Sequence, residues 1–293
     1  MRPRRAQTCL KSLSSPFSMH YDPIKRTLGS FFNQTPWLRI IFYKLLDLLL
    51  LRSWHIRRAL GQWNADRGNL PADILDAGSG FGQYSHRLAM INKGNRVTGV
   101  DVKAEQIADC NEFFVKLGMG NRVHFEEADL TTFVRPGAYD LILSVDVMEH
   151  ILQDEQVFAN FNKSLRPGGT LLISTPSDKG GSDADGHDSD PGHPHGFIDE
   201  HVRDGYNIKD IEDKLRRAGF SQVDAAYSYG RPGHVSWILS MKWPISMLGA
   251  SKIFFLILPF YYLLTFPFCL ILNLADLNGR HATGTGLIVK ARK

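Results

Sequence analysis

The chain has 293 residues, of which 43% are hydrophobic and 22% charged, and this composition excludes a wholly disordered protein. The formal net charge of +4 is mild, and its concentration near the N-terminus favours an anionic membrane surface over nucleic acid as a partner. The three cysteines lie far apart and match neither a disulfide framework nor a zinc spacing. We therefore expect one large α/β domain with appendages, in a reducing compartment.

Residues 1–35 form a basic leader, in which the first 18 residues contain four basic side chains and no acidic one. The leader lacks the continuous apolar core of a secretory signal. An organellar transit peptide and a disordered tail both fit this composition, and Met19 offers an alternative start. We expect disorder.

Residues 36–68 are predicted to form a helical region. Six charged side chains interrupt the apolar run at residues 36–60, so this run is a poor bilayer-spanning segment. Two interpretations stay open. The helix lies at a membrane interface with its basic side chains reaching toward the headgroups, or it packs on the core of the protein.

Residues 69–230 alternate short apolar segments with helix-like segments, a pattern typical of a parallel sheet with crossover helices. The expected strands are residues 73–77, 96–100, 123–127, 141–145, 169–175 and 222–227, with a last strand at 286–290 in the terminal segment 283–293. The expected helices are residues 84–91, 104–117, 154–165 and 208–218. The fold class is thus α/β, with a doubly wound, seven-stranded, Rossmann-like sheet.

The strongest motif is the segment ILDAGSGFGQYSHRL, in which Gly78, Gly80 and Gly82 follow a strand that carries Asp76. Glycines at this spacing let the backbone turn sharply and approach a ligand closely. The third glycine comes one residue too early for the dinucleotide-binding pattern. The segment resembles the first motif of class I S-adenosylmethionine-dependent methyltransferases, acidic-x-Gly-x-Gly-x-Gly. The resemblance implies S-adenosyl-L-methionine as the cofactor.

Further motifs over residues 74–226 follow in the order of that family. The resemblance implies that Asp101 accepts hydrogen bonds from both ribose hydroxyls, for which the two oxygens of a carboxylate are suited. It also implies that Asp129 contacts the adenine amino group and that Ser144 lies beside the methionine part. The segment LRPGGTLLIST is the usual turn before the fifth strand. The expected cofactor-binding residues are Asp76, Gly78, Gly80, Gly82, Asp101, Val102, Asp129, Leu130, Ser144 and Val145.

Candidate catalytic residues lie in two segments. Glu149 and His150 belong to VMEHI, which is similar to a segment of quinone-type and other lipid O-methyltransferases; a structural role beside the cofactor is the alternative for His150. His195, and His201 just beyond, belong to a long polar connection after the fifth strand. A base is required only where the acceptor must lose a proton. This connection matches no known metal-ligand spacing, so we expect a polar lid and no metal site.

Residues 231–282 are too apolar for a surface loop and form an insertion before the last strand. Residues 253–275 carry no charge and are long enough to cross a bilayer. A single crossing would separate strands that belong to one sheet, so the chain must return to its starting side. Pro259 and Pro267 predict that the helix breaks into a re-entrant or interfacial element. A dimer interface or an internal helical cap is the alternative.

These features predict methyl transfer to a lipid-soluble or membrane-presented acceptor, such as an isoprenoid quinone precursor, a polyprenyl-linked intermediate or a lipid headgroup. The expected location is the cytoplasmic face of a membrane, or an organelle if the leader is a transit peptide. Two alternatives are a catalytically silent S-adenosylmethionine-binding assembly factor and a soluble small-molecule methyltransferase whose insertion dimerises. The acceptor atom and the oligomeric state stay open.

Overall fold

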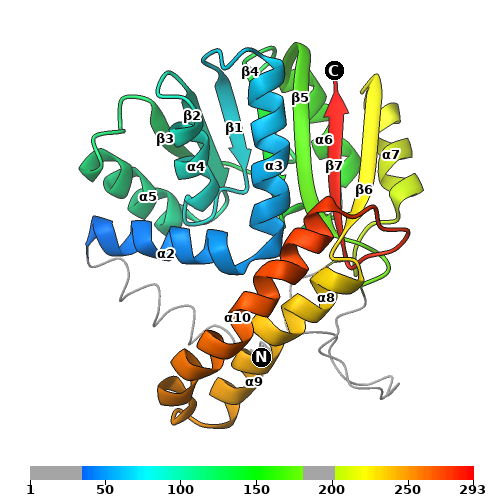
Figure 1. Cartoon of the computed structure of the whole chain (residues 1–293). Helices are drawn as coiled ribbons and strands as arrows, with labels where there is room; N and C mark the ends of the chain where they lie inside the picture. The colour runs from blue at the N-terminus through cyan, green and yellow to red at the C-terminus, as the bar shows by residue number, and fades with distance from the viewer. Residues whose placement is uncertain (1–34, 181–201) are drawn as a thin grey trace, which may run out of the picture.

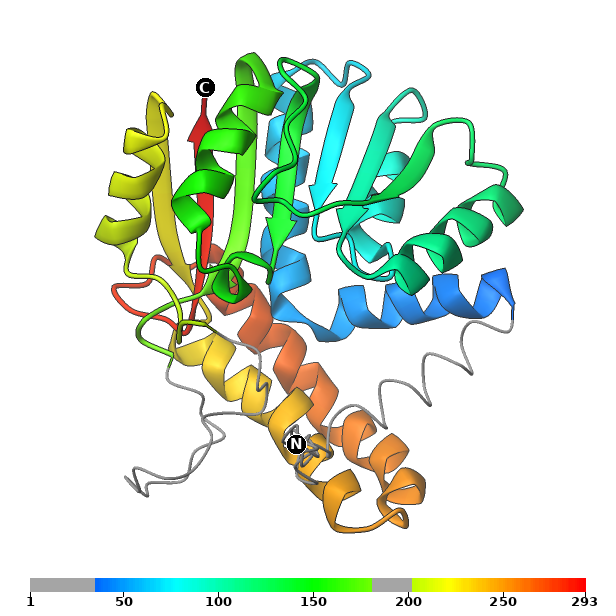
Figure 2. The same cartoon turned by 180° about the vertical axis from the view of Figure 1, so that it is seen from behind.

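The computed structural model describes residues 35–180 and 202–293. These residues form a sheet with helices on both faces, and a helical hairpin projects from one end of the sheet (Figures 1 and 2). Residues 1–34 of the predicted leader and the histidines His195 and His201 lie outside the described residues.

The sheet has the strand order β3-β2-β1-β4-β5-β7-β6, and β7 is antiparallel to both of its neighbours. The direction of the strand order changes between β1 and β4, which is where a doubly wound sheet binds its ligand. The predicted doubly wound, seven-stranded sheet is therefore confirmed. The strands are β1 (Asp73–Ala77), β2 (Arg96–Asp101), β3 (Val123–Glu127), β4 (Tyr139–Val145), β5 (Leu165–Pro176), β6 (Gln222–Ser228) and β7 (Gly286–Arg292).

Strand β5 begins four residues earlier than predicted, and helix α6 ends at Ser164. The reason is a shift in register between β4 and β5 that accommodates the turn-forming residues Pro167 and Gly168. Gly168 has a φ of +75°, which a residue with a side chain rarely adopts.

Helices cover the two faces of the sheet in separate layers. Ile74 of β1 faces one layer and its neighbour Leu75 faces the other, as expected for a parallel strand buried on both sides. One layer contains α3 (Leu51–Asp66), α4 (Gln83–Ile91) and α5 (Ala104–Lys116), and the other contains α6 (Asp154–Ser164) and α7 (Ile208–Arg217).

The N-terminal region forms two helices that meet at Leu50, whose backbone is extended. Helix α3 packs on the sheet through residues such as Ile56 and Leu60, so packing on the core is confirmed for this helix. Helix α2 (Pro36–Leu49) lies across the carboxyl ends of β1, β2 and β3 (Figure 1). The interfacial interpretation is wrong for Arg39, which is 3% exposed, because its guanidinium pairs with Asp109 inside the protein.

The apolar insertion forms the hairpin. Helix α8 (Arg231–Trp237), the π-helical turn η2 (Ile238–Lys242) and α9 (Trp243–Ala250) lead away from the sheet, and α10 (Phe254–Asn278) leads back. Ser228 at the end of β6 pairs with Gly286 at the start of β7, so the chain leaves and re-enters the sheet at adjacent points. The predicted return of the chain to one sheet is confirmed.

The prediction that Pro259 and Pro267 break the apolar segment is wrong, because α10 is continuous across both prolines. Helices α8 and η2 pack along α10, and prolines are tolerated inside an apolar helix that packs against neighbouring helices. The chain reverses direction at residues 251–253 instead. Lys252 therefore lies at the tip of the hairpin and not at its base.

Asp276 fixes the base of the hairpin to the domain. Its side chain is fully buried and accepts hydrogen bonds from the backbone N–H groups of Tyr229 and Gly233, at 3.2 and 3.1 Å. Nε2 of His55 and of His281 lie 2.9 and 3.2 Å from its two oxygens. Asp276 thus joins α10 to α3, α8 and the segment before β7, so the hairpin has a defined direction relative to the sheet.

Candidate cofactor and acceptor site

The predicted cofactor residues meet where neighbouring strands end. Ala77 of β1 pairs with Val100 of β2 and with Ser144 of β4. Gly78 and Asp101 follow at the next step of the two strands. The register of three parallel strands thus brings the glycine-rich turn, the predicted ribose ligand and the end of β4 to one edge.

The glycine-rich turn is held against β2, because the backbone N–H groups of Gly78 and Ser79 both donate to the carbonyl of Val100, at 2.8 and 2.9 Å. A Cβ atom on Gly78 would lie 2.2 Å from Cγ2 of Val147, so only glycine fits there. Gly80 is different, since a Cβ atom there would meet no atom within 4 Å. The turn therefore leaves open space beside Gly80, as a ligand requires.

Asp101 has the geometry expected of a ribose ligand. Its Oδ2 accepts the backbone N–H of Gly80 at 2.9 Å, and its Oδ1 accepts that of Lys103 at 3.1 Å. Each carboxylate oxygen can accept a second hydrogen bond, so both stay able to bind a hydroxyl. The adjacent Val102 is exposed at the same edge.

Asp129 and Leu130 follow β3, whose Glu127 pairs with Asp101. Oδ1 of Asp129 accepts hydrogen bonds from the backbone N–H and the hydroxyl of Thr131, both at 2.8 Å. Oδ2 of Asp129 accepts no hydrogen bond from the described residues. The side chain of Leu130 is buried in the core, so this residue offers only its backbone to a ligand.

Two buried hydroxyls at this edge support the fit to a cofactor. Oγ of Ser79 and Oγ of Ser144 are buried and have no hydrogen-bond partner among the described residues. Unpaired buried polar atoms are costly, and a bound ligand is one explanation for them. Val145, beside Ser144, is half-buried. These residues suit S-adenosylmethionine, which carries hydroxyl, carboxylate and amino groups.

Asp76 lies beneath the glycine-rich turn rather than within the open space. It is 2% exposed, and the hydroxyl of Ser85 donates to its Oδ2 at 2.5 Å. Burial raises the pKa of Asp76 to about 7. Its contacts indicate that it supports the turn and the first part of α4.

We expect the unfolding free energy to depend on pH through Asp76. The folded state keeps its proton up to about pH 7, whereas the unfolded chain releases it above about pH 4. The contribution of Asp76 to stability is therefore fully present below about pH 4 and is lost as the pH rises through 7. Urea unfolding of wild type and Asp76→Asn at pH 5 to 8 measures this, with the exposed Asp66→Asn as control. A stability difference that stays constant over this range contradicts the raised pKa.

The two described catalytic candidates lie in the turn η1 (Met148–His150), which follows β4. Glu149 is 1% exposed, its Oε2 accepts the hydroxyl of Thr175 at 3.1 Å, and burial raises its pKa. A carboxyl enclosed in this way is placed to hold the turn against β5. His150 is half-buried, so it is the better placed of the two to face one.

Sequence reasoning missed Arg52, which pairs with Asp146 at the end of β4. The backbone N–H of Arg52 also donates to the hydroxyl of Tyr229, at 2.9 Å. Asp146 has a φ of +52°, a strained conformation that is common at functional sites. These residues come from three distant segments, and no spacing in the sequence connects them.

Sequence reasoning also missed the contact between α2 and the glycine-rich turn. Arg39 Nη2 donates to the carbonyl of Phe81 at 2.7 Å, and the hydroxyl of Tyr43 donates to the same carbonyl. The signal was present, because polar residues at positions 39, 43 and 47 recur every four residues and so share one helix face.

No described group of three or more His, Cys, Asp or Glu side chains in residues 35–180 and 202–293 is arranged to hold a metal ion.

Residues 71–216 match the family model of a methyltransferase domain. The chain belongs to the class I S-adenosylmethionine-dependent methyltransferases. The match confirms the predicted family, whose members use S-adenosylmethionine as the methyl donor.

Among curated proteins, this methyltransferase is 32% identical over 157 residues to phosphoethanolamine N-methyltransferase 1 of Zea mays, covering 52% of the chain and 28% of that protein. It is 27% identical over 103 residues to the ubiquinone biosynthesis O-methyltransferase of Sodalis glossinidius, covering 35% of the chain and 41% of that protein. The chain spans only about a quarter to a half of the length of the curated relatives it matches.

Solved structures share the fold of this methyltransferase. A candidate sarcosine dimethylglycine methyltransferase from Galdieria sulphuraria has a TM-score of 0.56 at 17% identity, covering 82% of this chain and 85% of that one. Phosphoethanolamine N-methyltransferase 2 of Haemonchus contortus, solved with S-adenosyl-L-methionine, has a TM-score of 0.52 at 20% identity, covering 86% of this chain and 60% of that one.

Proposed function

We propose that this chain transfers the methyl group of S-adenosylmethionine to a lipid-soluble acceptor at a membrane surface, on the cytoplasmic side or in an organelle. The observation that carries the proposal is the position of the hairpin. It projects from the carboxyl edge of the sheet, where the cofactor residues lie (Figure 1). A bilayer that held the hairpin would lie on the same side of the molecule as the reacting methyl group.

The exposed surface of the hairpin supports a lipid environment. Among the described helices, only α10 is long and apolar enough to cross a bilayer, and only 11% of its apolar window is buried in the protein. Leu256, Leu263 and Leu264 are 71–74% exposed. Contiguous apolar surface of this kind marks an interaction site, and the absence of charge favours lipid over a protein partner, whose interfaces mix polar and apolar groups.

Two backbone carbonyls of the hairpin are bonded by side chains of the hairpin itself, and such internal bonding suits a hydrocarbon environment. Pro244 has no N–H group, so the preceding turn η2 loses one backbone donor. The hydroxyls of Tyr261 and Tyr262 donate to carbonyls of this turn, to that of Leu239 at 2.6 Å and that of Ser240 at 2.7 Å. The tyrosines thus provide these two carbonyls with donors from within the hairpin.

The cofactor supplies the methyl group and the leaving group when it is bound. The chain must hold the acceptor in line with that methyl group, exclude water and, for a hydroxyl acceptor, remove a proton. The glycine-rich turn and Asp101 orient the cofactor, and His150 is the described residue best placed to take the proton. His195 and His201, which lie outside the described residues, are further candidates for the base.

The acceptor class can be tested directly. We would incubate the protein with methyl-labelled S-adenosylmethionine and a total lipid extract, and we expect the label in the organic phase. Lipids from cells without the protein should contain a species lighter by one methyl group. The names of the relatives, which act on phosphoethanolamine or in ubiquinone biosynthesis, make headgroups and quinone precursors the first acceptors to examine.

Two other results would contradict the proposal. Label that enters only water-soluble compounds would indicate a soluble small-molecule methyltransferase with a dimerising insertion. Cofactor binding without any transfer would indicate a catalytically silent binding protein that acts in membrane assembly.

For a hydroxyl acceptor, His150→Gln is expected to lower kcat by about 100-fold to 10,000-fold, the usual contribution of a general base. The affinity for S-adenosylmethionine should stay near that of wild type, because the base acts on the acceptor alone. His124→Gln on β3, whose side chain is 54% exposed, is the matched control. Full activity of His150→Gln would indicate that His195 or His201 is the general base, or that the acceptor needs no base.

A further inference from the structure

Helix α2 has two faces with different partners. The inner face carries Arg39, Tyr43 and Asp47, which are spaced by four residues and so lie in one row. Oδ1 of Asp47 accepts a hydrogen bond from Nε2 of Gln83 at 2.9 Å, and its Oδ2 pairs with Arg87. These contacts, together with those of Arg39 and Tyr43 to the carbonyl at position 81, hold the glycine-rich turn and the start of α4.

The outer face of α2 is apolar and open. Trp37 is 61% exposed, and Ile41, Leu45 and Leu48 are 41–42% exposed. These four side chains follow the spacing of one helical stripe, and no described element covers them. The exposed Lys44 is the one charged side chain beside the stripe, since Asp47 belongs to the inner face.

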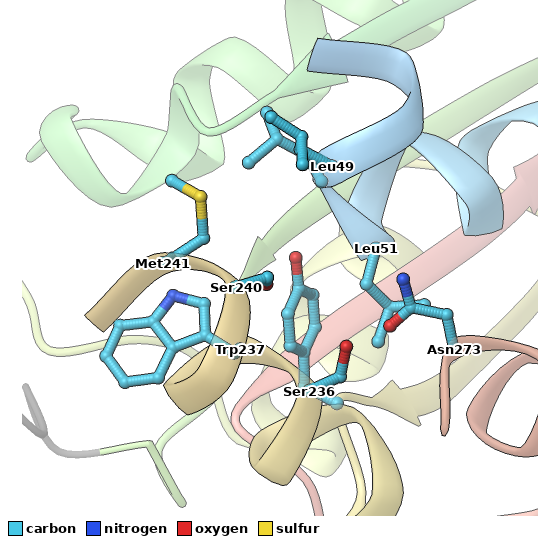
Figure 3. Close-up of a pocket in the computed structure, with 9 residues that line it drawn as sticks. Leu49, Leu51, Ser236, Trp237, Ser240, Met241 and Asn273 are labelled. Atoms are coloured by element: carbon cyan, nitrogen blue, oxygen red, sulfur yellow. The ribbon is translucent and has the colours of Figure 1, made fainter. Parts of the chain in front are cut away.

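The outer face points to the same side of the molecule as the hairpin. The inner face contacts residues above it at the carboxyl edge, so the outer face points away from the sheet, in the direction in which the hairpin projects (Figures 1 and 2). The hairpin and α2 meet at a small crevice, where Leu49 lies near Trp237 and Met241 (Figure 3). Its volume of about 10 Å³ admits about one water molecule, so the two elements are in close contact there.

This contact shows how far along the hairpin α2 lies. Beyond Met241, about ten residues of each helix extend past α2, which is about 15 Å at 1.5 Å per residue. That length is about half of a 30 Å hydrocarbon core. Lys242 and Trp243 then lie at the level of α2, and both are residue types that prefer the headgroup region.

We propose that the outer face of α2 rests on an anionic lipid surface, and that this contact tightens the cofactor site. The inference deepens the proposed function and rests on it. The charge fits this occupant, because Lys44 and Lys242 are basic and the stripe has no acidic side chain.

The coupling follows from the two faces of one helix. Helix α2 has 14 residues and no side-chain hydrogen bond at its N-cap, and an isolated helix of this length is marginal in water. A lipid surface that binds the outer face stabilises the helix, and the helix in turn holds the turn beside Gly80. By linkage, the cofactor must raise the affinity for the membrane by the same factor.

The full-length protein can test this. We would measure the Kd of S-adenosylhomocysteine by calorimetry in buffer, with phosphatidylcholine vesicles, and with phosphatidylcholine vesicles that contain phosphatidylserine. We expect the affinity to rise by about fivefold or more with the anionic vesicles, the lower end of typical coupling. The double variant Ile41→Glu, Leu45→Glu should have the same Kd as wild type in buffer, which would show that its cofactor site is folded. Its affinity should not rise when anionic vesicles are added.

Met90→Glu is the matched control, because Met90 is 54% exposed and lies at the end of α4 remote from the glycine-rich turn. Its affinity for S-adenosylhomocysteine should still rise with anionic vesicles.

Vesicles that bind the protein but leave the Kd unchanged would overturn the inference and leave the proposed function intact. An increase in affinity that survives in the double variant would also overturn the inference. So would an increase that depends on protein concentration in the absence of vesicles, because a second copy of the chain would then cover the outer face of α2. A protein that binds no S-adenosylhomocysteine under any condition would overturn the proposed function itself.

Discussion

Gly80→Val is expected to fold and to lose most of its affinity for S-adenosylmethionine. A Cβ atom at this position meets no protein atom within 4 Å, so the added methyl groups enter the space left for the ligand. Filling a packed site with extra methyl groups costs about 1–3 kcal/mol, which corresponds to a loss of affinity of about 5-fold to 150-fold. Calorimetric titration with S-adenosylmethionine measures the loss.

The matched control is Gly118→Val, in the turn after α5. Gly118 has a φ of +69° and Gly80 a φ of +50°, and neither would place a Cβ atom near another residue. Both variants therefore introduce a similar backbone strain of about 1–2 kcal/mol, seen as a lower Tm. Only Gly80→Val should lose the cofactor. An equal affinity in both variants would show that the ligand does not approach the glycine-rich turn.

The double variant Phe255→Asp, Leu256→Asp is expected to release the protein from liposomes. Both side chains lie near the tip of the hairpin and are 56% and 74% exposed. Each charge placed in hydrocarbon costs about 2.5 to 3.5 kcal/mol, so the two changes together outweigh a typical interfacial attachment. Co-sedimentation with vesicles measures release, and the affinity for the cofactor in buffer should not change.

Leu70→Asp, Met90→Asp is the control with the same change of charge. Leu70 precedes β1, so it lies at the opposite edge of the sheet, and both side chains are more than half exposed. This control should still sediment with vesicles. If the tip variant also sediments like wild type, the hairpin is not the membrane contact. A change of the tip variant from dimer to monomer in solution would assign the hairpin to dimerisation instead.

The fold class and the main part of the candidate cofactor site could be predicted from the sequence. Alternating apolar segments predicted the sheet, and Gly78, Gly80 and Gly82 with Asp101 marked the turn and its acidic partner. These features are readable because each depends on local spacing: glycine is favoured where the backbone has positive φ, and a parallel strand is apolar on both faces.

The tertiary structure alone decided the form of the hairpin. Pro259 and Pro267 indicated a broken helix, yet α10 is continuous because α8 and η2 pack beside it. The hydroxyls that complete η2 come from residues about twenty positions further along the chain. Hydrogen bonds between distant segments have no periodic trace in the sequence, so the local proline rule gave the wrong result.

Contacts between distant segments also explain why Arg39 is buried while Lys44, in the same helix, is exposed. In the sequence, Arg39 and Lys44 are equivalent charges in an apolar run, and both suit a membrane interface. In the structure, Arg39 pairs with Asp109 and contacts the glycine-rich turn, while Lys44 is exposed on the opposite face. Burial of a charge depends on whether a partner lies within reach. That partner is 70 residues away in the chain and is brought close only by the packing of α2 against α5.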